Sequence, residues 1–329
     1  MEEKMSIPVF DAHCDTILEI TESGESLRLN SKHIDLTRAM CFAPYAQVFA
    51  VFCRPWPEDI DFLKIDYSKD WPEDALKAMG GKLLDALLRE FEACGDILSH
   101  CRSAKDARQA AIQGKTAAFV AIEGAELIGC SLDSLDSAYK KGVRLINLCW
   151  NFDNALCGAA NAGQGGLTEK GRAYVRRMQE LGIAVDLSHA SEKTFWDAVE
   201  IASRPIIAGH SNSKTICENP RNLTDAQFKA LVELKGVAGI NLYPEFLTAR
   251  HTATIDDVVT HIDHFMELGG EKAVCLGGDL DGISETPAGI AGIQDYDKIF
   301  DALLKRGYSE NTVRDIFYNN LLEAMERVL

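Results

Sequence analysis

Eight short apolar runs, most of them separated by segments of helical character, constrain the fold of this 329-residue chain more than any other feature. This alternation is typical of a parallel sheet built from βα units. With eight such units we expect closure into a (β/α)8 TIM barrel, which chains of this length commonly fill as a single domain, here residues 1–329. The predicted strands are residues 7–13, 47–53, 116–122, 143–149, 183–189, 205–211, 236–243 and 273–279.

Two additions to a plain barrel are expected. A long insertion, residues 54–115, follows the second predicted strand. Within it, apolar residues recur at helical spacing over residues 74–94, and a shorter helix is expected over residues 103–113. The end of the chain, residues 296–329, is also helical by pattern. The sequence therefore predicts a barrel with a helical insertion after strand 2 and with C-terminal helices.

Polar side chains gather where the predicted strands end. A crossover helix between the fifth and sixth strands would bring His189 and His210 to one rim of the sheet. A single histidine at such a place more often only closes its strand, but two on consecutive strands favour a joint role. In α/β barrels the active site lies at the C-terminal ends of the strands. The polar residues predicted at that rim are His13, Asp15, Glu123, His189, His210 and Asp279.

These side chains are of the types that hold metal ions. His13 and Asp15 stand two residues apart, so in an extended chain they face the same side, and His189 with His210 supplies a second pair. The carboxylate of Glu123 can bridge two metals and leave room for a shared water or hydroxide, whose pKa such a pair lowers for hydrolysis. Nitrogen and oxygen ligands suit zinc, and manganese or cobalt is not excluded.

On these residues the sequence resembles the renal (membrane) dipeptidase family of the amidohydrolase superfamily. The shared motifs occur in the family's order and, with the C-terminal Tyr318-Asn-Asn-Leu321, span nearly the whole chain. Each motif is moderately specific, and the combination is highly specific. The motifs are Asp11-Ala-His13-Cys-Asp15, Ala121-Ile-Glu123-Gly, Asp186-Leu-Ser-His189, Ala208-Gly-His210-Ser-Asn, Asn219-Pro-Arg221-Asn-Leu and Gly277-Gly-Asp279-Leu-Asp281-Gly.

The resemblance implies a binuclear zinc-dependent dipeptidase. Such an enzyme hydrolyses the peptide bond of free dipeptides, which we take to include L-D dipeptides, and the family suggests a homodimer. His13 and Asp15 would hold one zinc ion, His189 and His210 would hold the other, and Glu123 would bridge the two.

The resemblance also implies roles for residues beyond the ligands. Arg221 would bind the C-terminal carboxylate of the substrate, a task that suits a planar guanidinium on a site loop. From the residues alone, a surface arginine in a loop is an equally good interpretation. Asp279 would bind the bridging water or the substrate amine and pass a proton to the leaving nitrogen. Glu123 and Asp279 are therefore the predicted catalytic residues.

The chain departs from the family after the fourth predicted strand. Mammalian members carry a substrate-contacting histidine where this chain has Trp150 or a near neighbour, and an indole cannot take up a proton as an imidazole can. We expect Trp150 to narrow the substrate pocket, with Asn151 or Asn154 as a neutral donor; Trp150 as a mere pocket wall is an equally good interpretation. Tyr243, at the end of the seventh strand, either lines the pocket or packs.

Two other functions are compatible with such a barrel. Another metal-dependent amidohydrolase, such as a deaminase or lactonase, commonly begins with His-X-His. Asp15 in the second place disfavours that reading, as does the lack of a lysine that could be carbamylated at the end of strand three or four. A barrel that only binds a ligand would be indicated by loss of a metal ligand, and all five predicted ligands are present.

The five remaining histidines fit no ligand position in this scheme. They are His33, His100, His251, His261 and His264. Because His261 and His264 share a face of a predicted helix, we expect both to be solvated.

Charge and cysteine content bear on partners and location. The formal net charge of −16, with no offsetting basic block, disfavours nucleic acid and anionic membranes and leaves a small dipeptide as the expected partner. Ten cysteines without a secretory signal indicate reduced thiols, and no apolar run reaches membrane-spanning length. We therefore expect a soluble cytoplasmic protein.

Overall fold

Eight parallel strands form a closed ring in the computed structural model, which describes residues 6–53, 73–250 and 252–329. A further short strand, β3, adds to the edge of β4 ahead of the point where β5 begins. The strands are β1 (Val9–Cys14), β2 (Tyr45–Val51), β3 (Leu98–His100), β4 (Thr116–Glu123), β5 (Val143–Asn147), β6 (Ala184–Asp186), β7 (Ile207–Ala208), β8 (Val237–Ile240) and β9 (Val274–Leu276).

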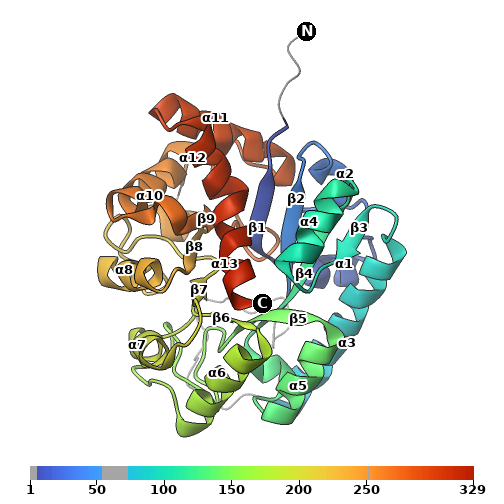
Figure 1. Ribbon diagram of the computed structural model, residues 1–329, viewed down its shortest axis with the longest axis vertical. Helices are drawn as coiled ribbons and strands as arrows, with labels where there is room; N and C mark the ends of the chain where they lie inside the picture. Colours follow the sequence, from blue (N-terminus) through green and yellow to red (C-terminus); the bar gives the residue numbers. More distant parts are fainter. Residues whose placement is uncertain (1–5, 54–72, 251) are drawn as a thin grey trace.

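Two pairings close the ring. β2 runs beside β4 from Ala46 opposite Ala117 onward, and β1 pairs with β9 where Asp11 lies opposite Leu276. The ring order is β1, β2, β4, β5, β6, β7, β8 and β9, and every pairing is parallel, so the C-terminal ends of the strands share one rim (Figure 1). The predicted (β/α)8 barrel is confirmed.

Helices surround the ring of strands (Figure 1). None of the helices in the described ranges combines the length and the apolar character needed to cross a bilayer. The helices are α1 (Thr16–Ser23), α2 (Leu36–Ala39), α3 (Glu73–Ala93), α4 (Ala104–Ile112), η2 (Ala125–Ile128), α5 (Leu132–Lys141), α6 (Glu169–Leu181), α7 (Glu192–Ile201), α8 (Asp225–Glu233), α9 (Pro244–Leu247), α10 (Ile255–Glu267), η3 (Gly270–Lys272), η4 (Ile293–Asp295), α11 (Tyr296–Arg306), α12 (Glu310–Arg314), η5 (Asp315–Asn319) and α13 (Asn320–Val328).

The predicted insertion after β2 holds the two expected helices, α3 and α4. Its first part, residues 54–72, lies outside the described residues. Strand β3 was not predicted, because three residues are too few to form a recognisable apolar run. Strands β6 and β7 end earlier than predicted, at Asp186 and Ala208, because the Asp186 carboxylate binds the backbone N–H groups of Ser188 and Gly209 and so ends the ladder there.

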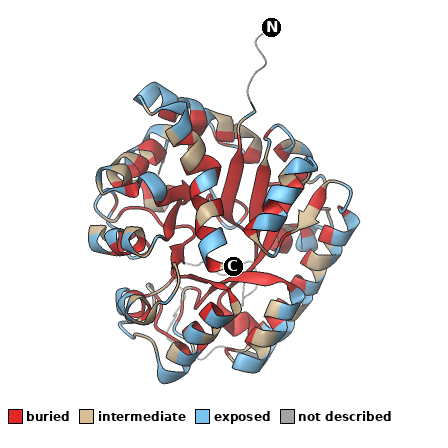
Figure 2. Ribbon diagram, viewed as in Figure 1, coloured by how far each residue is buried: buried red, intermediate tan, exposed pale blue. Residues whose placement is uncertain are grey.

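The C-terminal helix closes one end of the barrel. Leu321 and Met325 of α13 belong to the same buried cluster as Phe10 and Phe119, which stack inside the barrel with ring centroids 5.5 Å apart. That cluster includes the first residues of several strands, so α13 covers the N-terminal end of the ring. Figure 1 shows α13 in front of the strands, and Figure 2 shows the eight strands of the ring buried. The opposite rim carries the predicted polar residues.

Candidate metal centre

His13 lies in β1, and Asp15 is the N-cap residue directly before helix α1. The extended-chain explanation for their pairing is wrong for Asp15, whose backbone is already turned, with φ −107° and ψ 19°. The carboxylate of Asp11 fixes the backbone at His13, because it accepts the backbone N–H of His13 at 2.9 Å and the hydroxyl of Tyr296 at 2.6 Å. The two side chains still converge, with His13 Nε2 3.6 Å from Asp15 Oδ2.

Glu123 ends β4, and its two carboxylate oxygens face different histidines. Oε1 lies 2.8 Å from His189 Nε2 and 3.5 Å from His210 Nε2, while Oε2 lies 3.6 Å from His13 Nε2. The Nε2 atoms of His189 and His210 are 2.9 Å apart. The structure therefore brings all five predicted ligands together, and all five are buried.

One buried carboxylate organises the loops that carry the second histidine pair. Asp186 Oδ1 accepts the backbone N–H and the hydroxyl of Ser188 at 2.9 and 2.6 Å, and the backbone N–H of Gly209 at 3.1 Å. The Ser188 hydroxyl in turn accepts the backbone N–H of His210 at 3.0 Å. The end of β6 is thus tied to the end of β7, which fixes where His189 and His210 leave the sheet.

Burial and mutual charge set the protonation of the cluster. Burial alone would raise the pKa of Glu123, but the charge of His13 and the close contacts with His189 and His210 hold that pKa well below its usual range. Burial alone would lower the pKa of His13, but Glu123 and Asp15 raise it well above the ordinary value. Burial, aided by Arg221, lowers the pKa of His189 to about 3. The two carboxylates therefore favour positive charge on His13, whereas burial favours a neutral imidazole at His189.

Several buried atoms at the centre of the cluster fit a bound metal. Across the described ranges, His13 Nε2, Asp15 Oδ1 and Glu123 Oε2 have no hydrogen-bond partner. A buried polar group left in that state costs about 1–3 kcal/mol. Two sets of ligand atoms lie close enough to share an ion: one from His13, Glu123 and His210, the other from His13, Asp15 and Asp279. Imidazole nitrogens and carboxylate oxygens are zinc donors, so the residues present fit the metal.

Asp279 follows β9 in a left-handed backbone conformation, with φ +58°. This region is uncommon for residues other than glycine and is usually held by the surroundings. Here the Asp279 N–H donates to the His13 carbonyl at 3.2 Å, and Asp279 Oδ2 accepts from Asn241 Nδ2 at 2.8 Å. Its other oxygen, Oδ1, lies 3.8 Å from His13 Nε2. Burial raises the pKa of Asp279 to about 6.

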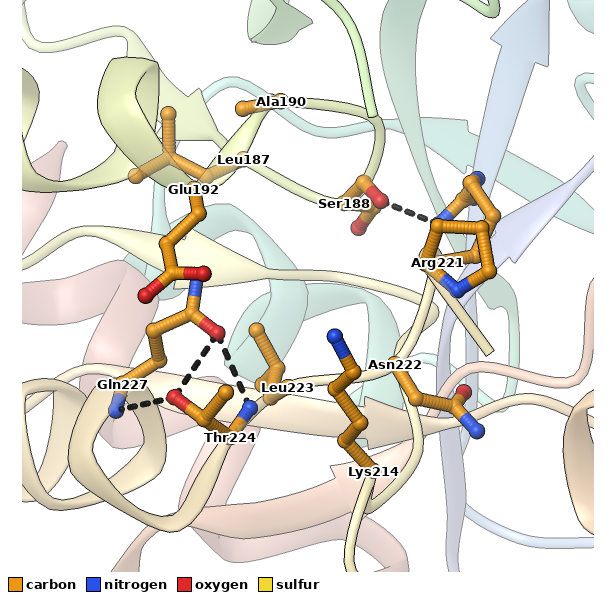
Figure 3. A pocket seen from close by; sticks show the side chains of 11 residues that line it. Leu187, Ser188, Ala190, Glu192, Lys214, Arg221, Asn222, Leu223, Thr224 and Gln227 are labelled. Carbon is orange, nitrogen blue, oxygen red and sulfur yellow. Dashed lines mark hydrogen bonds between the residues drawn. The ribbon is translucent and has the colours of Figure 1, made fainter. Parts of the chain in front are cut away.

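Arg221 is buried beside the histidines, so the interpretation of Arg221 as a surface residue is wrong. Its side chain is 5% exposed. The guanidinium donates to the Ser188 carbonyl and, at 2.9 Å, to His189 Nε2, and it lies 5.3 Å from the centre of the Phe246 ring. Figure 3 shows the contact with Ser188 at the edge of a pocket that Lys214 also lines. Arg221 is therefore within reach of whatever the histidines bind.

The other predicted substrate contacts occupy three different environments. Trp150 is buried, with its ring 6.3 Å from that of His189. Asn151 Oδ1 lies 2.9 Å from His189 Nδ1, so Asn151 touches a predicted ligand. Tyr243 is half-buried and packs edge-on against Phe246 at 5.0 Å.

A family model described as membrane dipeptidase, peptidase family M19, matches residues 4–329. The chain belongs to this family. Membership confirms the resemblance drawn from the motifs, and with it the predicted enzyme class, a metallo-dipeptidase.

Solved structures resemble this M19 chain over almost its full length. A metallopeptidase from Rhodobacter sphaeroides, liganded with a phosphinate mimic of the dipeptide L-Ala-D-Ala, is 28% identical and covers 98% of this chain and 100% of its own, with a TM-score of 0.88. The M19 metallopeptidase dipeptidase AC is 29% identical, covering 98% and 99%, with a TM-score of 0.87. The probable dipeptidase PvdM from Pseudomonas aeruginosa is 19% identical, covering 98% and 95%, with a TM-score of 0.88, and shares the fold.

Sequence reasoning missed the buried residues that hold this M19 site in place. Asp11 and Asp186 lie inside motifs that the sequence displays, and each binds the backbone N–H two residues further on. Asn241 does the same with Tyr243 at 2.7 Å. An Asp or Asn directly after an apolar run, where its side chain can bind the N–H two residues further on, is the signal that could have found all three. Glu126, which contacts the loop after β5, had no such signal.

The prediction that His261 is solvated is wrong. His261 is fully buried in α10, where its Nδ1 accepts the Ser213 N–H at 3.0 Å and its Nε2 lies 3.0 Å from the Leu247 carbonyl. The ring thus joins α10 to two loops, a contact that helical spacing could not reveal. His264 pairs with Asp225 at 2.8 Å.

Proposed function

We propose that this M19 dipeptidase binds two zinc ions and hydrolyses free dipeptides, L-D dipeptides included. The main support for the proposal is the orientation of the Glu123 carboxylate. One of its oxygens faces His189 and His210, and the other faces His13. The Rhodobacter sphaeroides relative was solved with a mimic of L-Ala-D-Ala, which supports an L-D substrate.

The ligands divide as two pairs around one carboxylate. His13 and Asp15 would hold one ion, His189 and His210 the other, and Glu123 would contact both. When bound, two such ions lower the pKa of a water molecule and polarise the scissile carbonyl.

The chain itself would position the substrate and move a proton. Asp279 faces the cluster through Oδ1, while Asn241 holds its Oδ2, so one oxygen remains available to accept a proton and return it to the leaving amine. Arg221 already donates to His189 Nε2, and its buried guanidinium would be available to a substrate carboxylate once that lone pair binds metal.

The test is a metal determination on protein purified without chelator, run beside a panel of L-L and L-D dipeptides with added zinc, cobalt or manganese. We expect about two metal ions per chain and hydrolysis of at least one class. Metal binding without hydrolysis of any dipeptide would indicate a barrel that only binds a ligand.

Arg221→Met is expected to lower kcat/KM on free dipeptides by roughly 10- to 100-fold, because a charge-assisted contact of this type contributes about 1.5–3 kcal/mol. The same variant should affect dipeptide amides far less, since they lack the carboxylate. Lys214→Met is the matched control, because Lys214 lines the pocket beside Arg221 and its ammonium faces Glu218 at 3.3 Å. Equal losses on acids and amides would show that Arg221 acts otherwise.

Trp150→His is expected to change the order of preference across the panel while leaving metal content unchanged. The Trp150 ring packs against Phe52 at 4.9 Å and lies 6.3 Å from the His189 ring, so a smaller polar ring there would leave more room beside His189. Reshaping an apolar pocket typically alters relative kcat/KM by roughly 10- to 200-fold. Trp150→Phe keeps the aromatic wall and serves as control. If every substrate changes by the same factor in Trp150→His, position 150 does not select substrates.

Location and assembly complete the proposal. All ten cysteines are free thiols, and nine of them are buried, which suits the reducing cytoplasm. We place the enzyme there as a homodimer, an assembly that sedimentation of the purified protein tests.

A further inference from the structure

His189 presents its two ring nitrogens to different partners. Nε2 lies 2.8 Å from Glu123 Oε1, within the proposed metal centre. Nδ1 lies 2.9 Å from Asn151 Oδ1. The same Oδ1 accepts from Asn161 Nδ2 at 3.2 Å, so both contacts use it as an acceptor. An amide oxygen only accepts, so Nδ1 carries the proton and the lone pair of the ring lies on Nε2.

We infer that Asn151 is a positioning residue that fixes the tautomer and direction of His189, and that the buried carboxylate of Glu126 holds the loop carrying Asn151. The inference deepens the proposed function and rests on His189 being a metal ligand. It changes the role predicted for Asn151 from a substrate contact to the support of a ligand.

Glu126 forms hydrogen bonds with the loop on both sides of Asn151. One carboxylate oxygen accepts the backbone N–H of Trp150 at 3.2 Å, and the other accepts from Asn154 Nδ2 at 2.7 Å. Asn154 also donates to the Leu148 carbonyl at 2.8 Å. The residue before Asn151 and the third residue after it are therefore tied to one buried group, which limits how far Asn151 can move from His189.

The backbone conformation at Gly124 allows Glu126 to reach the loop that carries Asn151. Gly124 has φ +97°, a conformation that residues with a side chain rarely adopt. A Cβ on Gly124 would overlap the Glu126 carboxylate. Because residue 124 is a glycine, the chain can turn directly after β4. Glu123 then faces the histidines, and the Glu126 carboxylate contacts the loop after β5.

Glu123 at the end of β4 and Glu126 in η2 therefore support the metal centre from opposite sides of the His189 ring. Glu123 contacts His189 Nε2 directly, and Glu126 supports His189 Nδ1 through the loop and Asn151. Histidines that bind metals usually donate their other N–H to such a partner, and removal of the partner typically costs roughly 10- to 100-fold in metal affinity or activity.

The experiment compares Asn151→Leu, which removes the acceptor, with Asn151→Asp, which keeps it. Asn161→Ala is the control, because Asn161 is exposed and touches Asn151 but not His189. The first readout is zinc affinity, measured by competition with a chelator. The second is the tautomer of His189 in metal-free protein, read from the ¹⁵N shifts of its ring by NMR. We expect Asn151→Leu to weaken one zinc equivalent by roughly 10- to 100-fold and to populate the Nε2-protonated ring.

In the same experiment Asn151→Asp should restore both readouts, and Asn161→Ala should leave both near wild type. Wild-type zinc affinity and an unchanged tautomer in Asn151→Leu would overturn the role of Asn151. The NMR readout needs no metal, so it still decides this point if wild-type protein binds no zinc and the proposed function fails.

Glu126→Gln tests the loop anchor separately. A glutamine has one acceptor where Glu126 uses two, so an N–H would face the donor of Trp150 or of Asn154. We expect weaker zinc binding and a mixed His189 tautomer, as in Asn151→Leu. A lower melting temperature with wild-type zinc affinity and tautomer would show that Glu126 only stabilises the fold, and would overturn its part in the inference.

Discussion

Glu123→Gln is expected to lower the metal content of the purified protein and to reduce kcat/KM on dipeptides by roughly 10³-fold or more. The side chain keeps its size, but it loses its negative charge and gains an N–H. One of its two ends would then present a donor, either to His189 and His210 or to His13. Since bound metals contribute several kcal/mol to a hydrolytic transition state, their loss should dominate the kinetics.

Thermal unfolding gives an independent measure of the same change. A metal that binds only the folded protein stabilises it by about 2.7 kcal/mol at 100 times its dissociation constant. Chelator should therefore lower the melting temperature of the wild-type enzyme much more than that of Glu123→Gln. Glu285→Gln, which neutralises an exposed carboxylate in the segment after β9, is the control and should behave as wild type. Full turnover at wild-type metal stoichiometry in Glu123→Gln would contradict the binuclear assignment.

The barrel and the gathering of the site residues could be predicted because both follow from periodic features. Apolar runs at regular intervals imply parallel strands, and the C-terminal ends of parallel strands meet at one rim. His13, Glu123 and His210 could thus be placed together with no knowledge of any loop. Burial of Arg221 could not be predicted, because it depends on how the loop after β7 folds back over Ser188 and His189.

The residues that hold the site residues in place act through contacts between loops. Such contacts do not recur at a regular spacing in the sequence, so they could not be predicted. Glu126 is three residues from Glu123, yet it acts on a loop that leaves the neighbouring strand. Asn241 bonds to Asp279 across the ends of β8 and β9, and no spacing rule joins two residues 38 positions apart. Asn151 was predicted as a substrate contact because the resemblance implies a substrate-contacting histidine at or near Trp150. The contact of its amide with His189 joins two loops and has no counterpart in the motifs.

Asp279→Asn is expected to lower kcat by roughly 10²- to 10⁴-fold, the usual contribution of a positioned proton-transfer group. Asparagine tolerates the left-handed conformation at φ +58° nearly as well as aspartate, so the backbone should survive the change. Its amide oxygen can still accept from Asn241, which leaves the amide nitrogen toward His13. What the variant loses is a carboxylate oxygen able to take a proton and give it to the leaving amine.

Asp281→Asn is the control that separates the loss of a proton-transfer group from a change in backbone strain in the same segment. Asp281 also has a positive φ, +71°, but its carboxylate accepts from Thr16 Oγ1 at 2.5 Å and from the His33 N–H at 2.6 Å. The free energy of unfolding of this control should fall by about 1–3 kcal/mol, which lowers its melting temperature. The control should retain most of its kcat. For Asp279→Asn, unchanged metal content and melting temperature with a large fall in kcat would identify a proton carrier. A parallel loss of metal would instead identify Asp279 as a ligand, which its closeness to His13 and Asp15 also permits.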